Sequence, residues 1–181
     1  MASSSRAVGS RKHDVFLSFC GEDTRITFAS TLHGVLKREN IDVFIDDELN
    51  RGEEISLSVV TAIEESMISV IIFSKGYGSS RWCLEELVKI MKCNKTQKLS
   101  IMPVFYHIDP SEVRNQTGTF GDGFARLVGS FDEEKLKKLQ MTEEQFKEKV
   151  HAWKNALTDA ANISGRTSDR KTFLMQLKAY V

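Results

Sequence analysis

The sequence predicts an α/β domain in which helices cover both faces of a parallel β-sheet. Segments of strand and helix character alternate about five times along the chain, which is the pattern of such folds. The strand segments are short apolar runs rich in β-branched residues, as expected where both faces of a strand are buried. The length of 181 residues indicates one domain with a sizeable core.

Four apolar runs are expected to form strands, at 14–19, 41–45, 68–74 and 99–106. The last run contains Pro103, which cannot donate a ladder hydrogen bond and therefore predicts a bulge or a position near the sheet edge. A very short fifth strand is expected after Gly165, a residue that predicts the end of a helix.

Apolar residues at helical spacing predict the helices. Their expected ranges are 25–39, 55–67, from 81 onward, 119–128, 146–160 and 169–181. Residues 107–118 are expected to form a long loop, because Asp109-Pro110 is a turn signal, and residues 132–144 a solvated surface segment. The Ser-rich, basic residues 1–12 have no apolar signal region and predict a disordered tail, which leaves 13–181 as the folded domain.

Composition excludes several classes of function. The net charge is +0, so the basic surplus of a nucleic-acid-binding surface is missing, and no apolar run is long enough to span a bilayer. The four histidines are scattered without zinc-like spacing, so no metal site is predicted. The cysteines cannot all pair and form no CxxC motif, which indicates a reducing, cytosolic setting. They are Cys20, Cys83 and Cys93.

The stretch 68–91 joins the third strand to a helix that Ser79 or Ser80 can cap. An apolar stripe on that helix predicts its core face, and Trp82 and Glu86 lie together on another face, one turn apart. Two interpretations remain open for this stretch taken alone. Trp82 and Glu86 line a small-molecule pocket, or a surface glutamate lies beside a tryptophan that holds a loop.

Topology favours the pocket. Ligands of open parallel sheets bind beyond the carboxyl ends of the strands, where the winding reverses. In a flavodoxin-like sheet this point lies between the first and third strands. The segments that leave those strands are 20–25 and 74–87, so a pocket is predicted near Trp82 and Glu86.

Five phrases in order resemble the plant-type TIR (Toll/interleukin-1 receptor-like) domain of nucleotide-binding, leucine-rich-repeat immune receptors. The resemblance covers 13–165 and implies a three-layer flavodoxin-like sandwich with a five-stranded parallel sheet in the order 2-1-3-4-5. The phrases are DVFLSFCGEDTR at 14–25, FIDDELNRGEEI at 44–55, AIEES at 62–66, SSRWCLEEL at 79–87 and PVFYHIDPSEVRNQTGTFG at 103–121.

The resemblance implies an enzyme that, when self-associated, hydrolyses the nicotinamide–ribose bond of NAD+ or NADP+. The products, nicotinamide and ADP-ribose-type signals, act in plant immune signalling and cell death, and NAD+ is the substrate, so no cofactor is implied. The family's catalytic glutamate corresponds to Glu86. A carboxylate stabilises the positive charge that builds on the ribose, and nicotinamide leaves neutral, so no general acid is required. Glu85 is instead expected to form a surface ion pair with Lys89.

Substrate contacts are expected from the loops that follow the first three strands and from the start of the helix at 81. Cys83 is expected to pack rather than to act as a nucleophile, because no histidine accompanies it in sequence. The predicted substrate-binding residues are Trp82, Cys20, Gly21, Arg25, Asn50, Arg51, Gly52, Ser74 and Tyr77.

Three residues depart from the family pattern: Cys20 replaces an arginine, Asn50 stands where some relatives carry a basic residue, and Thr31 replaces a histidine. An alternative function is therefore a TIR self-association module with weak or no catalysis. Self-association is expected through the helix around Ser30, the helix at 120–126 and the final helix, and the location is expected to be the cytoplasm, with the nucleus as a second compartment. A phosphoacceptor receiver is set aside, because no acidic pair ends the first strand.

Overall fold

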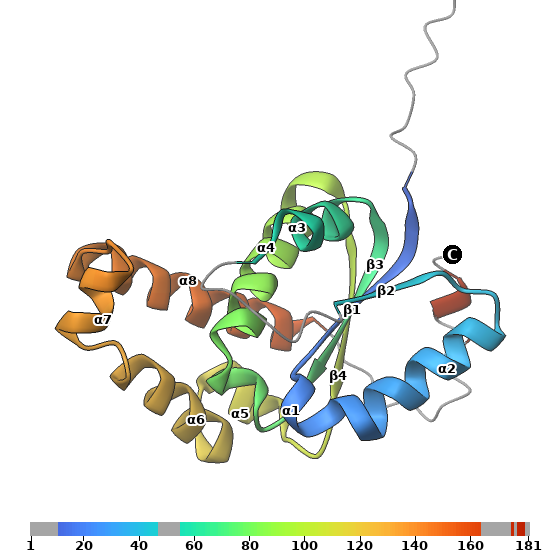
Figure 1. The fold of residues 1–181 in the computed structure, drawn as a ribbon. Coiled ribbons are helices and arrows are strands. Elements are labelled where there is room, and N and C mark those ends of the chain that lie inside the picture. Colours follow the sequence, from blue (N-terminus) through green and yellow to red (C-terminus); the bar gives the residue numbers. More distant parts are fainter. Residues whose placement is uncertain (1–10, 47–54, 164–174, 176, 180–181) are drawn as a thin grey trace, which may run out of the picture.

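A computed structural model describes residues 11–46, 55–163, 175 and 177–179. Its strands form a parallel sheet with helices on both faces (Figure 1). The order β2-β1-β3-β4 confirms the predicted fold over these strands, and the expected fifth strand lies outside the described residues. The strands are β1 (His13–Phe19), β2 (Val43–Ile45), β3 (Ser66–Phe73) and β4 (Ser100–Phe105).

Alternate residues of the central strands contribute to two separate apolar layers. On β1, Phe16 belongs to the layer beneath α3, α4 and α8, whereas Val15 and Leu17 belong to the layer beneath α2. The β1–β3 register pairs Leu17 with Val70, and both side chains are buried. Burial on both faces explains why these strands are apolar runs without polar alternation.

The proline in β4 lies in the last strand of the described sheet. Pro103 pairs with Ile71 of β3, and β4 is the edge of the sheet within the described residues. The residues expected to form a fifth strand next to β4 lie outside the described ranges, so the edge position that Pro103 favours stays a prediction.

The helix expected at 25–39 begins earlier and is irregular. α1 (Gly21–Thr24) follows β1 after a single residue, η1 (Arg25–Ala29) is a π-helical turn, and α2 (Ser30–Arg38) completes the segment. The Thr24 hydroxyl donates to the Cys20 carbonyl at 2.7 Å, which holds the first turn against the end of β1. The carboxyl end of β1 therefore leads directly into the N-terminus of α1.

The next two helices agree closely with prediction. α3 (Leu57–Glu64) precedes β3, and the short 3-10 turn η2 (Tyr77–Ser79) leads into α4 (Arg81–Gln97). The Ser80 hydroxyl caps α4 by accepting from the Cys83 amide at 3.3 Å. This cap places Trp82 and Glu86 in the first two turns of α4.

The loop expected at 107–118 is wrong in part, because it contains α5 (Pro110–Asn115). The Asp109 carboxylate accepts from the Ser111 amide at 2.8 Å. A proline in the first helical turn loses no hydrogen bond, since that turn's amides have no partner within the helix. The Asp-Pro pair thus starts a helix instead of a loop, and α6 (Gly118–Gly129) follows it.

The segment expected to be a solvated surface is also structured. α7 (Glu133–Lys138) buries Leu136, and a capping box between Thr142 and Gln145 starts α8 (Glu143–Asn162). Phe131, Phe146 and Trp153 pack as an aromatic cluster beside it. In Figure 1, α6, α7 and α8 extend to one side of the sheet. Gly165 and most of the helix expected at 169–181 lie outside the described residues.

Candidate functional site

Two hydrogen bonds fix the Glu86 carboxylate at the carboxyl end of the sheet. Its Oε1 accepts from Nε1 of Trp82 at 2.7 Å, and its Oε2 accepts from Oγ of Ser18 at 2.8 Å. Trp82 comes from the preceding turn of α4, and Ser18 comes from β1, where it pairs with Ile71 of β3. The site thus lies at the β1–β3 junction that topology indicated.

Burial around Glu86 is more complete than the predicted stripe suggests. Glu86 is 3% exposed and Trp82 is 7% exposed. The buried arc of α4 extends beyond the apolar stripe at Leu84 and Leu87, because the helix N-terminus also packs on the end of β1. Glu86 is therefore part of the interior, and its substitution has a structural cost that the helical pattern alone does not show.

A second hydroxyl lies behind Ser18. The hydroxyl of Tyr77 lies 2.9 Å from Oγ of Ser18 and 3.2 Å from the Cys83 carbonyl oxygen, so its one proton can be donated to either. Burial is the largest cause that raises the pKa of Tyr77 well above its ordinary value, followed by repulsion from Cys83, where that thiol is deprotonated, and from the Glu86 carboxylate. Tyr77, a predicted substrate contact, is fully buried beneath Glu86, so it reaches the carboxylate through Ser18.

Two of the cysteines meet beside this cluster. The Cys83 thiol donates to the Phe19 carbonyl at 3.5 Å, and its hydrogen bond with Cys20, its burial and the Glu86 charge all raise its pKa. A buried thiol with a raised pKa holds little thiolate, which supports a packing role for Cys83. Cys20 is itself buried.

The other predicted contacts fall in four places. Gly21 begins α1, and Ser74 is buried directly after β3. Arg25 begins η1. The last three, Asn50, Arg51 and Gly52, lie outside the described residues. The structure thus brings Trp82 directly to Glu86 and Tyr77 to it through Ser18, while Cys20 contacts Cys83. The roles of these residues toward a substrate stay predictions.

A second carboxylate lies near the site. Leu17 pairs with Ile45, so the residues that follow them, Ser18 and Asp46, are neighbours at the ends of β1 and β2. Asp46 is buried. Two acidic side chains therefore share this edge of the sheet.

The ion pair expected between Glu85 and Lys89 is wrong. Glu85 accepts from Lys149 of α8 at 2.7 Å and lies 3.6 Å from Nε of Arg81. Lys89 pairs instead with Glu64 of α3. These pairs connect α4 to α3 and α8. Glu85 is thus neutralised by cations, whereas the buried Glu86 is held by the neutral donors Trp82 and Ser18.

Ser18 is a site residue that the sequence reasoning missed. The period of two along β1 places Ser18 on the same face as Phe16 and Cys20, which both belong to the layer beneath α4. Ser18 could have been predicted from two features. It is a polar residue on a buried strand face, and its strand ends at the predicted switch point.

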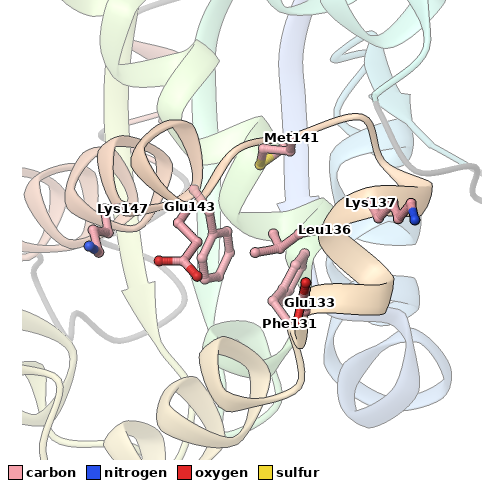
Figure 2. Close-up of a pocket in the computed structure, with 8 residues that line it drawn as sticks. Phe131, Glu133, Leu136, Lys137, Met141, Glu143 and Lys147 are labelled. Atoms are coloured by element: carbon pink, nitrogen blue, oxygen red, sulfur yellow. The ribbon is translucent and has the colours of Figure 1, made fainter.

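Two hollows lie away from Glu86. One, of about 710 Å³, lies between α7 and α8, where Figure 2 shows Phe131, Leu136 and Met141 between charged residues such as Lys137 and Lys147. The other, of about 450 Å³, lies between α6 and α8 and includes Phe124. Neither touches the residues around Glu86.

The described ranges hold neither a candidate metal-binding cluster nor a candidate membrane span. Histidine, cysteine, aspartate and glutamate side chains there form no group of three that could hold a metal ion. None of the helices in those ranges has the length and apolar character needed to cross a bilayer.

Comparisons with known proteins agree on one family. The family model for the TIR domain matches residues 12–177. The chain is 50% identical over 153 residues to disease resistance protein RPV1 of Vitis rotundifolia, a match that covers 84% of this chain. It is 42% identical over 172 residues to TMV resistance protein N of Nicotiana glutinosa, which covers 94%.

A solved structure has the same fold. The TIR domains in the structure of the activated Roq1 resistosome directly recognizing the pathogen effector XopQ are 41% identical to this chain, with a TM-score of 0.75. That match covers 93% of this chain and 99% of the other. The chain spans only 10% of the length of RPV1 and 14% of that of protein N.

Proposed function

This chain belongs to the TIR domain family, and from that premise we propose that it hydrolyses the nicotinamide–ribose bond of NAD+ with Glu86 as the catalytic residue. The single observation that carries the proposal is the buried Glu86 carboxylate, held by Trp82 and Ser18 at the β1–β3 end of the sheet. NAD+ or NADP+ is the substrate, and no resident cofactor or metal is needed.

The chemistry requires a fixed negative charge. Departure of neutral nicotinamide leaves positive charge on the ribose, and a preorganised carboxylate stabilises that charge without moving. Glu86 meets this requirement because two donors from different elements fix its orientation. Burial strengthens the effect, since few water molecules screen a charge at this depth.

We also propose that the domain acts in plant immune signalling and cell death after self-association, in the cytoplasm or nucleus. The likeness to disease resistance proteins and to the TIR domains of the Roq1 resistosome supports this proposal. Ser30 and Thr31 of α2 are exposed and suit one contact surface. On α6, Phe120 is buried, so exposed neighbours such as Asp122 and Arg126 are the residues available for the second.

A second candidate function is a self-association module with weak catalysis. Cys20 favours it, because this position carries an arginine in the family phrase and here holds a buried thiol in contact with Cys83. A cysteine cannot supply the five donors of a guanidinium to a phosphate or ribose.

Nicotinamide release from NAD+ and NADP+ by the purified domain at high concentration distinguishes the two candidates. Glu86→Gln keeps the side-chain volume and removes the charge, and Glu85→Gln is its matched control on the adjacent, ion-paired residue. We expect the first variant to lose about a hundredfold or more of the rate and the second to stay within about twofold. Equal rates for both variants, or no release by the unsubstituted domain, would contradict the proposal.

A further inference from the structure

We propose that Ser18 and Tyr77 form a hydroxyl chain that orients the Glu86 carboxylate, which makes Ser18 a positioning residue of the site. The inference rests on the proposed function for its catalytic consequence and on the structure alone for the chain itself. The three side chains come from β1, η2 and α4, and consecutive oxygen atoms lie 2.9 and 2.8 Å apart.

The charge of Glu86 sets the direction of both hydrogen bonds. An ionised carboxylate only accepts, so the single hydroxyl proton of Ser18 must point to Oε2. Oγ of Ser18 can then only accept from Tyr77, whose proton turns toward Ser18 at 2.9 Å rather than toward the Cys83 carbonyl at 3.2 Å. Tyr77 keeps its proton at neutral pH, because burial raises its pKa.

Protonation of Glu86 permits the reverse order. The carboxylic acid can donate to Ser18, Ser18 to Tyr77, and Tyr77 to the Cys83 carbonyl. Tyr77 therefore donates to Ser18 when Glu86 is ionised and to the Cys83 carbonyl when Glu86 is protonated. The chain therefore couples the charge of Glu86 to the direction of the Tyr77 hydroxyl.

Burial of the two hydroxyl groups makes the effect of removing either one specific. Ser18 and Tyr77 have 0% exposure, so bulk water does not replace a hydroxyl that is removed. Ser18→Ala takes one of the two named donors from Glu86, and Trp82 still holds Oε1. Tyr77→Phe leaves Ser18 in place and removes only the group behind it.

The titration of Glu86 has to be distinguished from that of the other titratable groups close to it. The phenol of Tyr77 and the thiol of Cys83 are neutral below pH 7, because the pKa of each is raised; the third group is the Cys20 thiol, which contacts Cys83. Asp46, at the end of β2 beside Ser18, is a second buried carboxyl group close to this layer. Asp46→Asn therefore serves as the control that assigns a titration to Glu86.

The test uses the indole signals of the two tryptophans, measured by 1H–15N NMR during acid titration. The Trp82 indole donates to Glu86 and reports its charge, whereas Nε1 of Trp153 has no hydrogen-bond partner within the described part and is the internal reference. Trp153→Phe assigns the two signals. We expect the Trp82 signal to titrate in the wild-type and Asp46→Asn proteins alike.

Ser18→Ala should raise the midpoint of the Trp82 titration by about one pH unit, because a donor to the ionised form is lost. Tyr77→Phe should raise it by a smaller amount, and Ser18→Thr, which keeps the hydroxyl, should restore the wild-type midpoint. If both Ser18→Ala and Tyr77→Phe titrate at the wild-type midpoint, the chain does not orient Glu86. If Ser18→Ala does not fold, Tyr77→Phe decides the question alone.

Turnover supplies the catalytic half of the test. In Ser18→Ala the acid limb of the rate profile for nicotinamide release should move up with the indole midpoint, with kcat reduced about tenfold and KM within about twofold. An unchanged rate profile despite a shifted midpoint would remove Ser18 from catalysis. Full activity in Glu86→Gln would instead overturn the proposed function while leaving the hydroxyl chain intact.

Discussion

Replacement of Trp82 by phenylalanine isolates the hydrogen bond that holds Glu86. The ring stays largely in place, and the donor 2.7 Å from Oε1 is removed. A hydrogen bond to a buried charged group contributes about 1.5–3 kcal/mol. Lost packing adds about 1–2 kcal/mol, so we expect the free energy of unfolding to fall by about 2.5–5 kcal/mol.

Trp153→Phe is the matched control for that loss. Trp153 is fully buried and packs on Phe131 and Phe146, but its Nε1 has no hydrogen-bond partner in the described ranges. Its replacement should therefore cost only the packing part. Urea unfolding followed by circular dichroism at pH 7 measures both variants. Equal losses would show that the Trp82–Glu86 hydrogen bond contributes nothing to stability and would refute the electrostatic reasoning.

Further predictions concern pH, packing and assembly. The pKa of Tyr77 is raised in the folded state, so the unfolded chain loses the phenol proton at a lower pH than the folded protein does. The free energy of unfolding should therefore fall as the pH rises above about 10. Urea unfolding at alkaline pH should show this fall, and it should be less steep in Tyr77→Phe. Gly121→Ala should cost about 3 kcal/mol, since a Cβ there would lie 2.2 Å from the Gln116 carbonyl oxygen, whereas Gly129→Ala meets open space and should cost nothing in the same unfolding assay. Turnover per molecule should rise with protein concentration alongside light scattering; a flat profile from a protein that stays monomeric would contradict coupling between assembly and catalysis.

Local signals predicted the elements that form the site. The strand at β3, the Ser80 cap and the four-residue spacing of Trp82 and Glu86 all depend on residues close in sequence. Helical spacing placed Trp82 and Glu86 together, and the structure confirms their contact. The parallel order of the strands then brought the end of β1 to the same place.

The features that sequence reasoning missed depend on partners distant in the chain. Lys149 lies 64 residues from Glu85, so helical spacing favoured the nearer Lys89. α7 reads as polar because its one buried residue, Leu136, has its apolar neighbours on other segments. The hydrogen bond that holds Oε2 of Glu86 likewise comes from Ser18, which is 68 residues away.

The central claim is that the charge of Glu86 drives cleavage of the nicotinamide–ribose bond. The most direct measurement compares initial rates of nicotinamide release by the wild-type domain and Glu86→Gln, at concentrations where light scattering shows both to be equally assembled. Equal assembly separates catalysis from self-association. The account predicts release by the wild type and a loss of about a hundredfold or more in Glu86→Gln. A variant that assembles equally and releases nicotinamide at the wild-type rate would contradict it.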